Sequence, residues 1–180
     1  NLKNEGIVHG LVDVVRTGDV MYDAALYYSK IAEDYPSPSK QLPEKFVLVT
    51  VHRAENSDNE TNLKRILKGL KALGEVLPVV WPIHPRTQNA LTKYNLSTDG
   101  LTILKPVGYL EMIRLLKACT LVATDSGGLQ KEAYFFGKPC ITLRNETEWV
   151  ELIESGHNRL VGQSAEKILT MGIEMIEKDK

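Results

Sequence analysis

Short apolar runs alternate with segments of helical periodicity along most of the chain, and this alternation restricts the folds open to the sequence. The runs that we predict as strands are 11–15, 46–51, 76–83, 101–104, 121–124, 140–143 and 159–161. The segments that we predict as helices are 20–31, 60–73, 88–94, 109–118, 129–136, 147–154 and 165–178, with Asp19 as the N-cap of the first and 35–39 as a loop. Strands that alternate with helices form a parallel sheet with helices on both faces. We therefore expect an α/β, Rossmann-like fold.

Length and composition are those of an ordinary globular domain. The 180 residues suffice for one domain with a substantial core, and a formal net charge of −1 gives no reason to expect a nucleic-acid partner. We see no signal peptide and no apolar stretch long enough to cross a bilayer. Cys119 and Cys140 lie in apolar runs, which indicates buried thiols in a reducing cytoplasm. Because the first residue is Asn rather than Met, we expect the chain to begin inside a longer protein.

A serine and two glycines follow the apolar run 121–124, at a predicted strand-to-helix turn. The first backbone N–H groups of a helix lack intrahelical acceptors and attract anions, and glycine lets an anion approach the backbone closely. Ser126, Gly127 and Gly128 therefore form a candidate phosphate or pyrophosphate site, and Glu132, one turn further on, could accept hydrogen bonds from ribose hydroxyls. An ordinary tight turn that needs glycine only for its bend is the alternative.

Polar clusters also follow three other predicted strands, at 52–56, 84–86 and 144–148. The carboxyl ends of parallel strands share one edge of a sheet, so we expect the four clusters to meet at one crevice. His52 could donate to a phosphate, act as an acid, or cap the strand end by bonding the backbone. His84 could bind an anion or orient the turn at Pro85, and Arg53 could pair locally with Glu55. We find no metal-ligand spacing and no nucleophile elbow.

These motifs resemble those of the non-hydrolysing UDP-N-acetylglucosamine 2-epimerases. The matching segments are 49–56, 83–86, 125–133, 137–139, 143–144 with 147–148, and 160–162. The resemblance implies a two-domain GT-B architecture with a UDP-sugar in the cleft between two Rossmann-like halves. It implies that residues 1–180 are the carboxyl-terminal UDP-binding domain and that the amino-terminal half, with the carboxylates that handle the proton at sugar C2, is absent. It also implies a cytoplasmic enzyme that is a homodimer at full length and needs neither cofactor nor metal.

The family reaction eliminates UDP across C1–C2 to give a glycal, and UDP then adds back with inversion at C2. By resemblance, Ser126, Gly127 and Gly128 bind the pyrophosphate, Glu132 binds the ribose, and His52 is the catalytic residue in this half. In bacterial members a second UDP-N-acetylglucosamine binds as an activator. The positions that match its contacts here are Arg53 and His84.

Two positions depart from the family pattern. Trp149 stands where many bacterial members have arginine, and Met112 stands where an aromatic residue is common. Relatives that act on other UDP-2-acetamido sugars share the same framework, so the sequence leaves the exact sugar open. A GT-B glycosyltransferase and a nucleotide-binding module without catalysis are the alternative functions.

Overall fold

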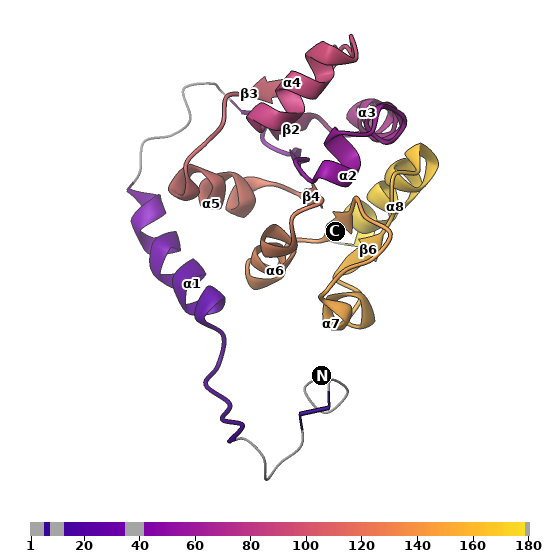
Figure 1. Cartoon of the computed structure of the whole chain (residues 1–180). Helices are drawn as coiled ribbons and strands as arrows, with labels where there is room; N and C mark the ends of the chain where they lie inside the picture. The colour runs from indigo at the N-terminus through magenta and orange to yellow at the C-terminus, as the bar shows by residue number, and fades with distance from the viewer. Residues whose placement is uncertain (1–5, 8–12, 35–41, 179–180) are drawn as a thin grey trace.

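A computed structural model describes residues 6–7, 13–34 and 42–178 of the chain (Figure 1). The predicted loop 35–39 and the first two residues of the predicted strand 11–15 lie outside the described residues. The remainder of that strand prediction is wrong: Asp13, Val14 and Val15 have no regular structure. Val15 is 74% exposed, so it lacks the neighbouring strand that a β-branched run needs in order to be buried.

The centre of the molecule is a six-stranded parallel sheet with the order β3-β2-β1-β4-β5-β6. Its strands are β1 (Val47–Thr50), β2 (Val79–Pro82), β3 (Thr102–Leu104), β4 (Leu121–Thr124), β5 (Cys140–Thr142) and β6 (Asn158–Leu160). The helices are α1 (Val20–Glu33), α2 (Ala54–Ser57), α3 (Glu60–Gly74), α4 (Pro85–Lys93), α5 (Tyr109–Ala118), α6 (Gly127–Phe135), α7 (Val150–Glu154) and α8 (Ala165–Lys178). The predicted α/β fold with a parallel sheet is therefore confirmed.

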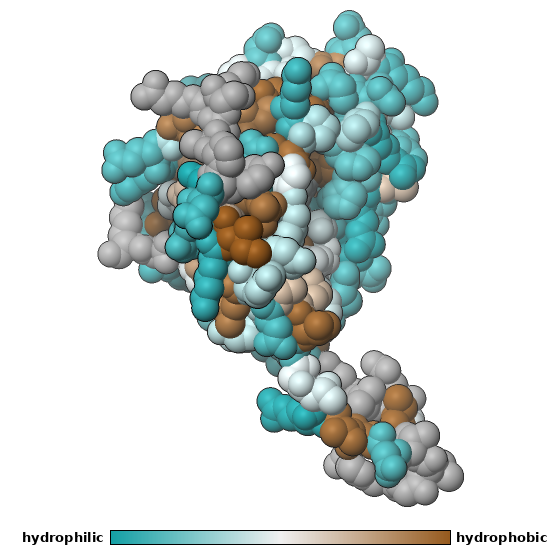
Figure 2. All heavy atoms as spheres, turned by 90° about the vertical axis from the view of Figure 1, so that its left-hand side faces the viewer, coloured by the Kyte–Doolittle hydropathy of each residue, from teal (hydrophilic) through white to brown (hydrophobic). Residues whose placement is uncertain are grey.

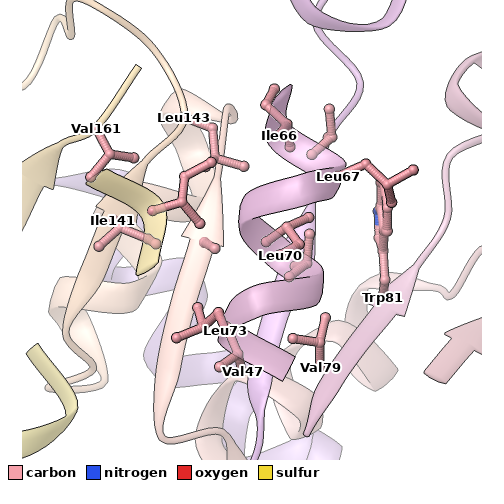
Figure 3. Packing of buried hydrophobic residues seen from close by; sticks show 14 of the residues in the cluster. Val47, Ile66, Leu67, Leu70, Leu73, Val79, Trp81, Ile141, Leu143 and Val161 are labelled. Atoms are coloured by element: carbon pink, nitrogen blue, oxygen red, sulfur yellow. The ribbon is translucent and has the colours of Figure 1, made fainter. Parts of the chain in front are cut away.

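Side chains of the strands point alternately to the two faces of the sheet, and each face has its own core. On one face, Val47 and Val49 of β1 belong to a cluster with residues of α3 and α8, and Figure 3 shows Leu70 and Leu73 of α3 in this cluster. On the other face, Leu48 packs with residues of α5 and α6. Figure 1 shows α3 and α8 on one side of the strands and α1, α5 and α6 on the other. Because both faces are covered, the strands are almost wholly apolar.

Helices α3 and α8 approach each other closely at Gly69 of α3. A Cβ added at this position would lie 2.8 Å from the Cβ of Ile168, which belongs to α8. The two helices are also close at Gly172 of α8, where an added Cβ would lie 3.0 Å from Leu73 Cδ1 of α3. Glycine at both positions therefore allows the close packing that holds α8 against α3.

Helix α1 packs against the rest of the molecule through buried alanines, and backbone carbonyl groups at its C-terminal end accept hydrogen bonds from α5. Ala25 and Ala32 are fully buried, and Arg114 of α5 donates to the carbonyl oxygens of Ala32 and Glu33 at 3.3 and 3.4 Å. Figure 2 shows hydrophobic side chains among mostly hydrophilic ones on the side where α1 lies. The predicted N-cap is confirmed, because the Asp19 side chain accepts from the backbone N–H of Met21 at 2.9 Å.

Element boundaries agree with the predictions where local signals are strong. The bounds of α5, β4 and α8 are those predicted. Helix α6 begins at Gly127 rather than at 129, so the two glycines form the first turn of the helix instead of preceding it. Helix α4 begins at Pro85 and α7 at Val150, and α2 has no counterpart among the predicted helices.

Both cysteines are buried and free, as predicted. Within the part of the chain that the structure describes, no helix has the length and apolar character needed to cross a membrane.

Candidate functional site

The candidate site lies at the carboxyl edge of the sheet, where the strand order reverses. The chain runs from β1 outward to β3 and then returns to place β4 on the other side of β1. Connections leave β1 and β4 in opposite directions, and such a reversal opens a crevice between them. A pocket of about 380 Å³ occupies this place. Its lining residues are Thr50, Val51, His52, Pro82, Ile83, His84, Pro106, Val107, Met112, Ser126, Gly128, Leu129 and Glu132.

Ser126 and the two glycines form the amino-terminal end of α6 at this pocket. Ser126 is the N-cap, and its hydroxyl accepts from the backbone N–H of Leu129 at 3.4 Å. Gly127 and Gly128 are the first two residues of the helix, where backbone N–H groups have no intrahelical acceptor. The positive end of the helix dipole therefore faces the pocket, which suits an anionic ligand.

Gly127 and Gly128 differ in the space that the surrounding residues leave for a Cβ atom. A Cβ at Gly127 would lie 2.1 Å from Glu148 Oε1, so a side chain there would require the Glu148 carboxylate, which is paired with Arg53 and Arg144, to move. Among the residues that the structure describes, a Cβ at Gly128 would meet only Met21 Cε at 3.8 Å and Ser126 Oγ at 3.9 Å, and neither glycine has a positive φ. Packing and backbone geometry therefore leave room for a Cβ at Gly128, which lines the pocket.

Asp125, which precedes the N-cap, is a fully buried carboxylate that organises the end of β1. It accepts from the backbone N–H groups of His52 and Arg53 at 3.0 and 2.9 Å and from Asn56 Nδ2 at 3.1 Å. Burial favours the neutral acid, but the bonds from His52, Arg53 and Asn56 outweigh it and hold the pKa of Asp125 below its ordinary value. Asp125 is therefore an anion that only accepts hydrogen bonds.

The two histidines of the pocket present different nitrogen atoms. His52 Nδ1 lies 3.2 Å from Asp125 Oδ1, so this nitrogen carries a proton and Nε2 is left for a ligand. His84 is the N-cap of α4, and its Nδ1 accepts from the backbone N–H of Arg86 at 3.2 Å. The neutral His84 ring therefore carries its proton on Nε2. The ring centroids are 5.6 Å apart, so the two imidazoles lie side by side at the pocket.

Glu132 reaches the same pocket from the second turn of α6. Its Oε1 accepts from the hydroxyl of Tyr109 at 2.8 Å. Burial raises the pKa of Glu132, and the bond from Tyr109 opposes that rise. Burial, followed by the bond to Glu132, raises the pKa of Tyr109 to about 12, so the phenol remains a donor at neutral pH.

A network of ion pairs borders the pocket on the side of β5. Arg144 is 7% exposed, donates to Glu148 Oε2 at 2.7 Å and lies 3.3 Å from Glu55 Oε1. Arg53 pairs with Glu148 Oε1 at 3.4 Å. The expected local pair of Arg53 with Glu55 is therefore wrong, because each residue has a partner from the 144–148 segment instead. Burial opposes ionisation of Glu148, but a backbone bond and the Arg144 bond hold its pKa below the ordinary value.

Trp149 supports the first turn of α6. Its Nε1 donates to the carbonyl oxygen of Gly127 at 2.8 Å. The ammonium of Lys131 lies 4.5 Å from the Trp149 ring centroid and 2.5 Å from Asp19 Oδ2. Trp149 thus connects the segment after β5 to the first turn of α6, and Lys131 connects both to the start of α1.

Three of the four polar clusters contribute to one pocket, whereas the fourth, 144–148, borders the pocket without lining it. His52, His84, Ser126, Gly128 and Glu132 line one pocket. Arg53 and Gly127 lie beside it, in contact with Glu148. The sequence interpretation assigned no role to Asp125, Asn56 or Tyr109. For Asp125, a signal was present, since an acidic residue directly follows a buried strand, whereas nothing local connects Tyr109 to Glu132.

Comparisons with known proteins place the chain in a family. The family model described as UDP-N-acetylglucosamine 2-epimerase matches residues 1–180. A UDP-2,3-diacetamido-2,3-dideoxy-D-glucuronate 2-epimerase of Pseudomonas aeruginosa is 46% identical over 170 residues, which are 94% of this chain and 47% of that protein. A UDP-N-acetylglucosamine 2-epimerase of Methanocaldococcus jannaschii is 40% identical over 192 residues, covering 100% of this chain and 52% of that protein. The chain therefore spans about half the length of these relatives.

Solved structures give the same result. The structure of the M. jannaschii enzyme in complex with UDP-GlcNAc and UDP has a TM-score of 0.85 at 38% identity, over 97% of this chain and 51% of that one. An E. coli heptosyltransferase has a TM-score of 0.51 at 16% identity, over 99% of this chain and 53% of that one, which shows a shared fold only. The sheet and its pocket define a Rossmann-like domain that matches half of a GT-B structure. The chain belongs to the UDP-N-acetylglucosamine 2-epimerase family.

Proposed function

We propose that this chain is the carboxyl-terminal, UDP-binding half of a cytoplasmic, homodimeric UDP-N-acetylglucosamine 2-epimerase with two GT-B domains. The observation that carries the proposal is the pocket between β1 and β4, which gathers His52, Ser126, Gly128 and Glu132 around the amino-terminal end of α6. A pyrophosphate at that end would meet free backbone N–H groups and a favourable dipole.

The proposed reaction interconverts UDP-GlcNAc and UDP-ManNAc. The C2 proton of the sugar is not acidic enough for direct removal, so UDP leaves from C1 as a proton leaves C2, and a C1=C2 double bond forms. UDP then adds back at C1 while a proton is delivered to the opposite face of C2. No net oxidation occurs, and the leaving pyrophosphate gains negative charge as the C1–O bond breaks.

This half of the protein would stabilise the leaving group. Ser126, Gly127 and Gly128 would bind the pyrophosphate. His52, as the doubly protonated imidazolium, would donate from Nε2 to a phosphate oxygen while Asp125 accepts from its Nδ1. Fixed donors that face the growing charge lower the barrier most when the charge exists mainly in the transition state. Glu132 would accept hydrogen bonds from the ribose hydroxyls.

Arg53 and His84 are proposed contacts of a second UDP-sugar, by resemblance to bacterial relatives. The neutral His84 ring carries a donor on Nε2. The Arg53–Glu148 pair is 3.4 Å long, and both side chains are about two-fifths exposed, at 40% and 42%. An exposed pair of this kind contributes about 0–1 kcal/mol, so a phosphate could replace Glu148 as the partner of Arg53.

Calorimetry and isotope exchange test the proposal together. We expect UDP to bind this chain weakly, because half of the cleft is absent, and we expect no epimerisation by the chain alone. The full-length protein should exchange the sugar C2 proton with deuterium from the solvent. A well-folded chain that fails to bind UDP would contradict the UDP site. Turnover by the chain alone would contradict the division of labour between the halves.

A further inference from the structure

The hydroxyl of Tyr109 forms a hydrogen bond with a carboxylate that lines the pocket. Tyr109 is the first residue of α5, and its hydroxyl donates to Glu132 Oε1 on α6 at 2.8 Å. Glu132 lines the pocket between β1 and β4, whereas Tyr109 is not among the residues that line it. The phenol therefore reaches the pocket only through the carboxylate.

The chemistry of this pair leaves one carboxylate oxygen for a ligand. A carboxylate has two oxygens, each with about two acceptor sites, and Tyr109 occupies one site on Oε1, so Oε2 keeps both of its sites for a ligand. Since burial raises the pKa of Glu132, a donor at Oε1 also helps to keep the group ionised. An ionised acceptor makes stronger hydrogen bonds than a neutral one.

The Tyr109 ring also contacts α1. Tyr28 meets it edge to face, with ring centroids 5.6 Å apart, although both residues are partly exposed. This contact favours one orientation of the Tyr109 ring and so supports the position of its hydroxyl at Glu132.

We propose that Tyr109 is a positioning residue for ribose recognition, whose hydroxyl orients the Glu132 carboxylate toward the ribose hydroxyls of a bound nucleoside diphosphate. This inference rests on the proposed ribose contact of Glu132. If Tyr109 serves only to pack α1 against α5 and α6, its hydroxyl has no influence on how the pocket distinguishes one ribose from another.

The test compares Tyr109→Phe with Tyr28→Phe, a matched control that removes a hydroxyl from the same ring pair but leaves the bond to Glu132. Each protein is titrated with UDP and with the dideoxyribose analogue of UDP, which lacks both ribose hydroxyls. We expect Tyr109→Phe to lower the UDP affinity by about fivefold to tenfold, in keeping with the net contribution of a typical hydrogen bond. Its affinity for the analogue should match that of the unmodified protein, and Tyr28→Phe should change neither.

Each outcome decides one step of the inference. If the unmodified protein prefers UDP to the analogue and Tyr109→Phe keeps that preference, the positioning role is wrong while the ribose contact stands. If the unmodified protein binds both ligands equally, the ribose contact of Glu132 is wrong and the role of Tyr109 is wrong with it. An equal loss for both ligands in Tyr109→Phe would assign the hydroxyl to packing. Glu132→Gln should reproduce the selective loss of UDP affinity if the ribose contact is right.

Discussion

At the scale of single residues, the neighbours of His52 determine which of its two ring nitrogens can contact a ligand. Asp125 is buried, ionised and 3.2 Å from Nδ1, so the ring can rotate little without losing that bond. A carboxylate that is shielded from solvent therefore sets the direction in which Nε2 points. This arrangement follows the general pattern in which a hydrogen-bonded carboxylate fixes the orientation of an imidazole ring.

We expect His52→Ala in the full-length enzyme to lower the rate far more than the affinity for UDP. The pyrophosphate charge that His52 meets grows as the C1–O bond breaks, so the lost bond matters mainly in the transition state. A donor at such a site contributes about 3 kcal/mol, which corresponds to a rate loss on the order of a hundredfold. Steady-state kinetics and UDP titration of the same variant measure both effects. Near-normal turnover with a large loss of UDP affinity would instead assign His52 to binding.

At the scale of elements, the two glycines in the first turn of α6 differ in the space around them. A Cβ at Gly127 would displace the Glu148 carboxylate, whereas a Cβ at Gly128 has room. We expect Gly128→Val to abolish measurable UDP binding while the melting temperature stays within about 5 °C, because a helix propensity change of about 1 kcal/mol or less is involved. Calorimetry and thermal unfolding provide the two measurements.

A matched control for Gly128→Val is Gly74→Ala, at the end of α3. An added Cβ there would meet its nearest neighbour, Leu101 Cδ2, at 3.7 Å, which is an ordinary contact. This variant should keep both UDP affinity and stability. Parallel losses of folding and UDP affinity in Gly128→Val would show that glycine is needed there for the fold.

Elements with strong local signals could be predicted from the sequence, and contacts between distant segments could not. The apolar stripe of α5 and the run that forms β4 were sufficient to place both. Helix α2 has only four residues, which is too short for a periodic pattern to appear. The convergence of the polar clusters followed from parallel strands alone. The partners of Arg53 and Glu132 depend on side chains that lie far away in the sequence, so no spacing rule reveals them.

At the scale of the whole molecule, a ligand that binds only the folded chain stabilises all of it. UDP at a hundredfold excess over its Kd should increase the free energy of unfolding by about 2.7 kcal/mol. For a chain of this length, the corresponding rise in Tm is about 5–10 °C. Thermal unfolding at several UDP concentrations tests the expectation, with Gly128→Val as the variant that should not respond. An unchanged Tm at concentrations that saturate the calorimetric signal would mean that UDP does not favour the folded state.

The adjacency of β1 and β4 also determines when the pocket can exist during folding. Thr50 and Thr124 contact each other through their hydroxyl oxygens at 2.6 Å, yet they are 74 positions apart in the chain. Closing so long a loop is entropically unfavourable and slow compared with pairing β1 to β2. A nascent chain that has emerged only as far as β3 therefore has one wall of the pocket and lacks the first turn of α6. Under the proposed function, affinity for UDP arises only when β4 and α6 have formed, so UDP would bind complete molecules and not incomplete ones.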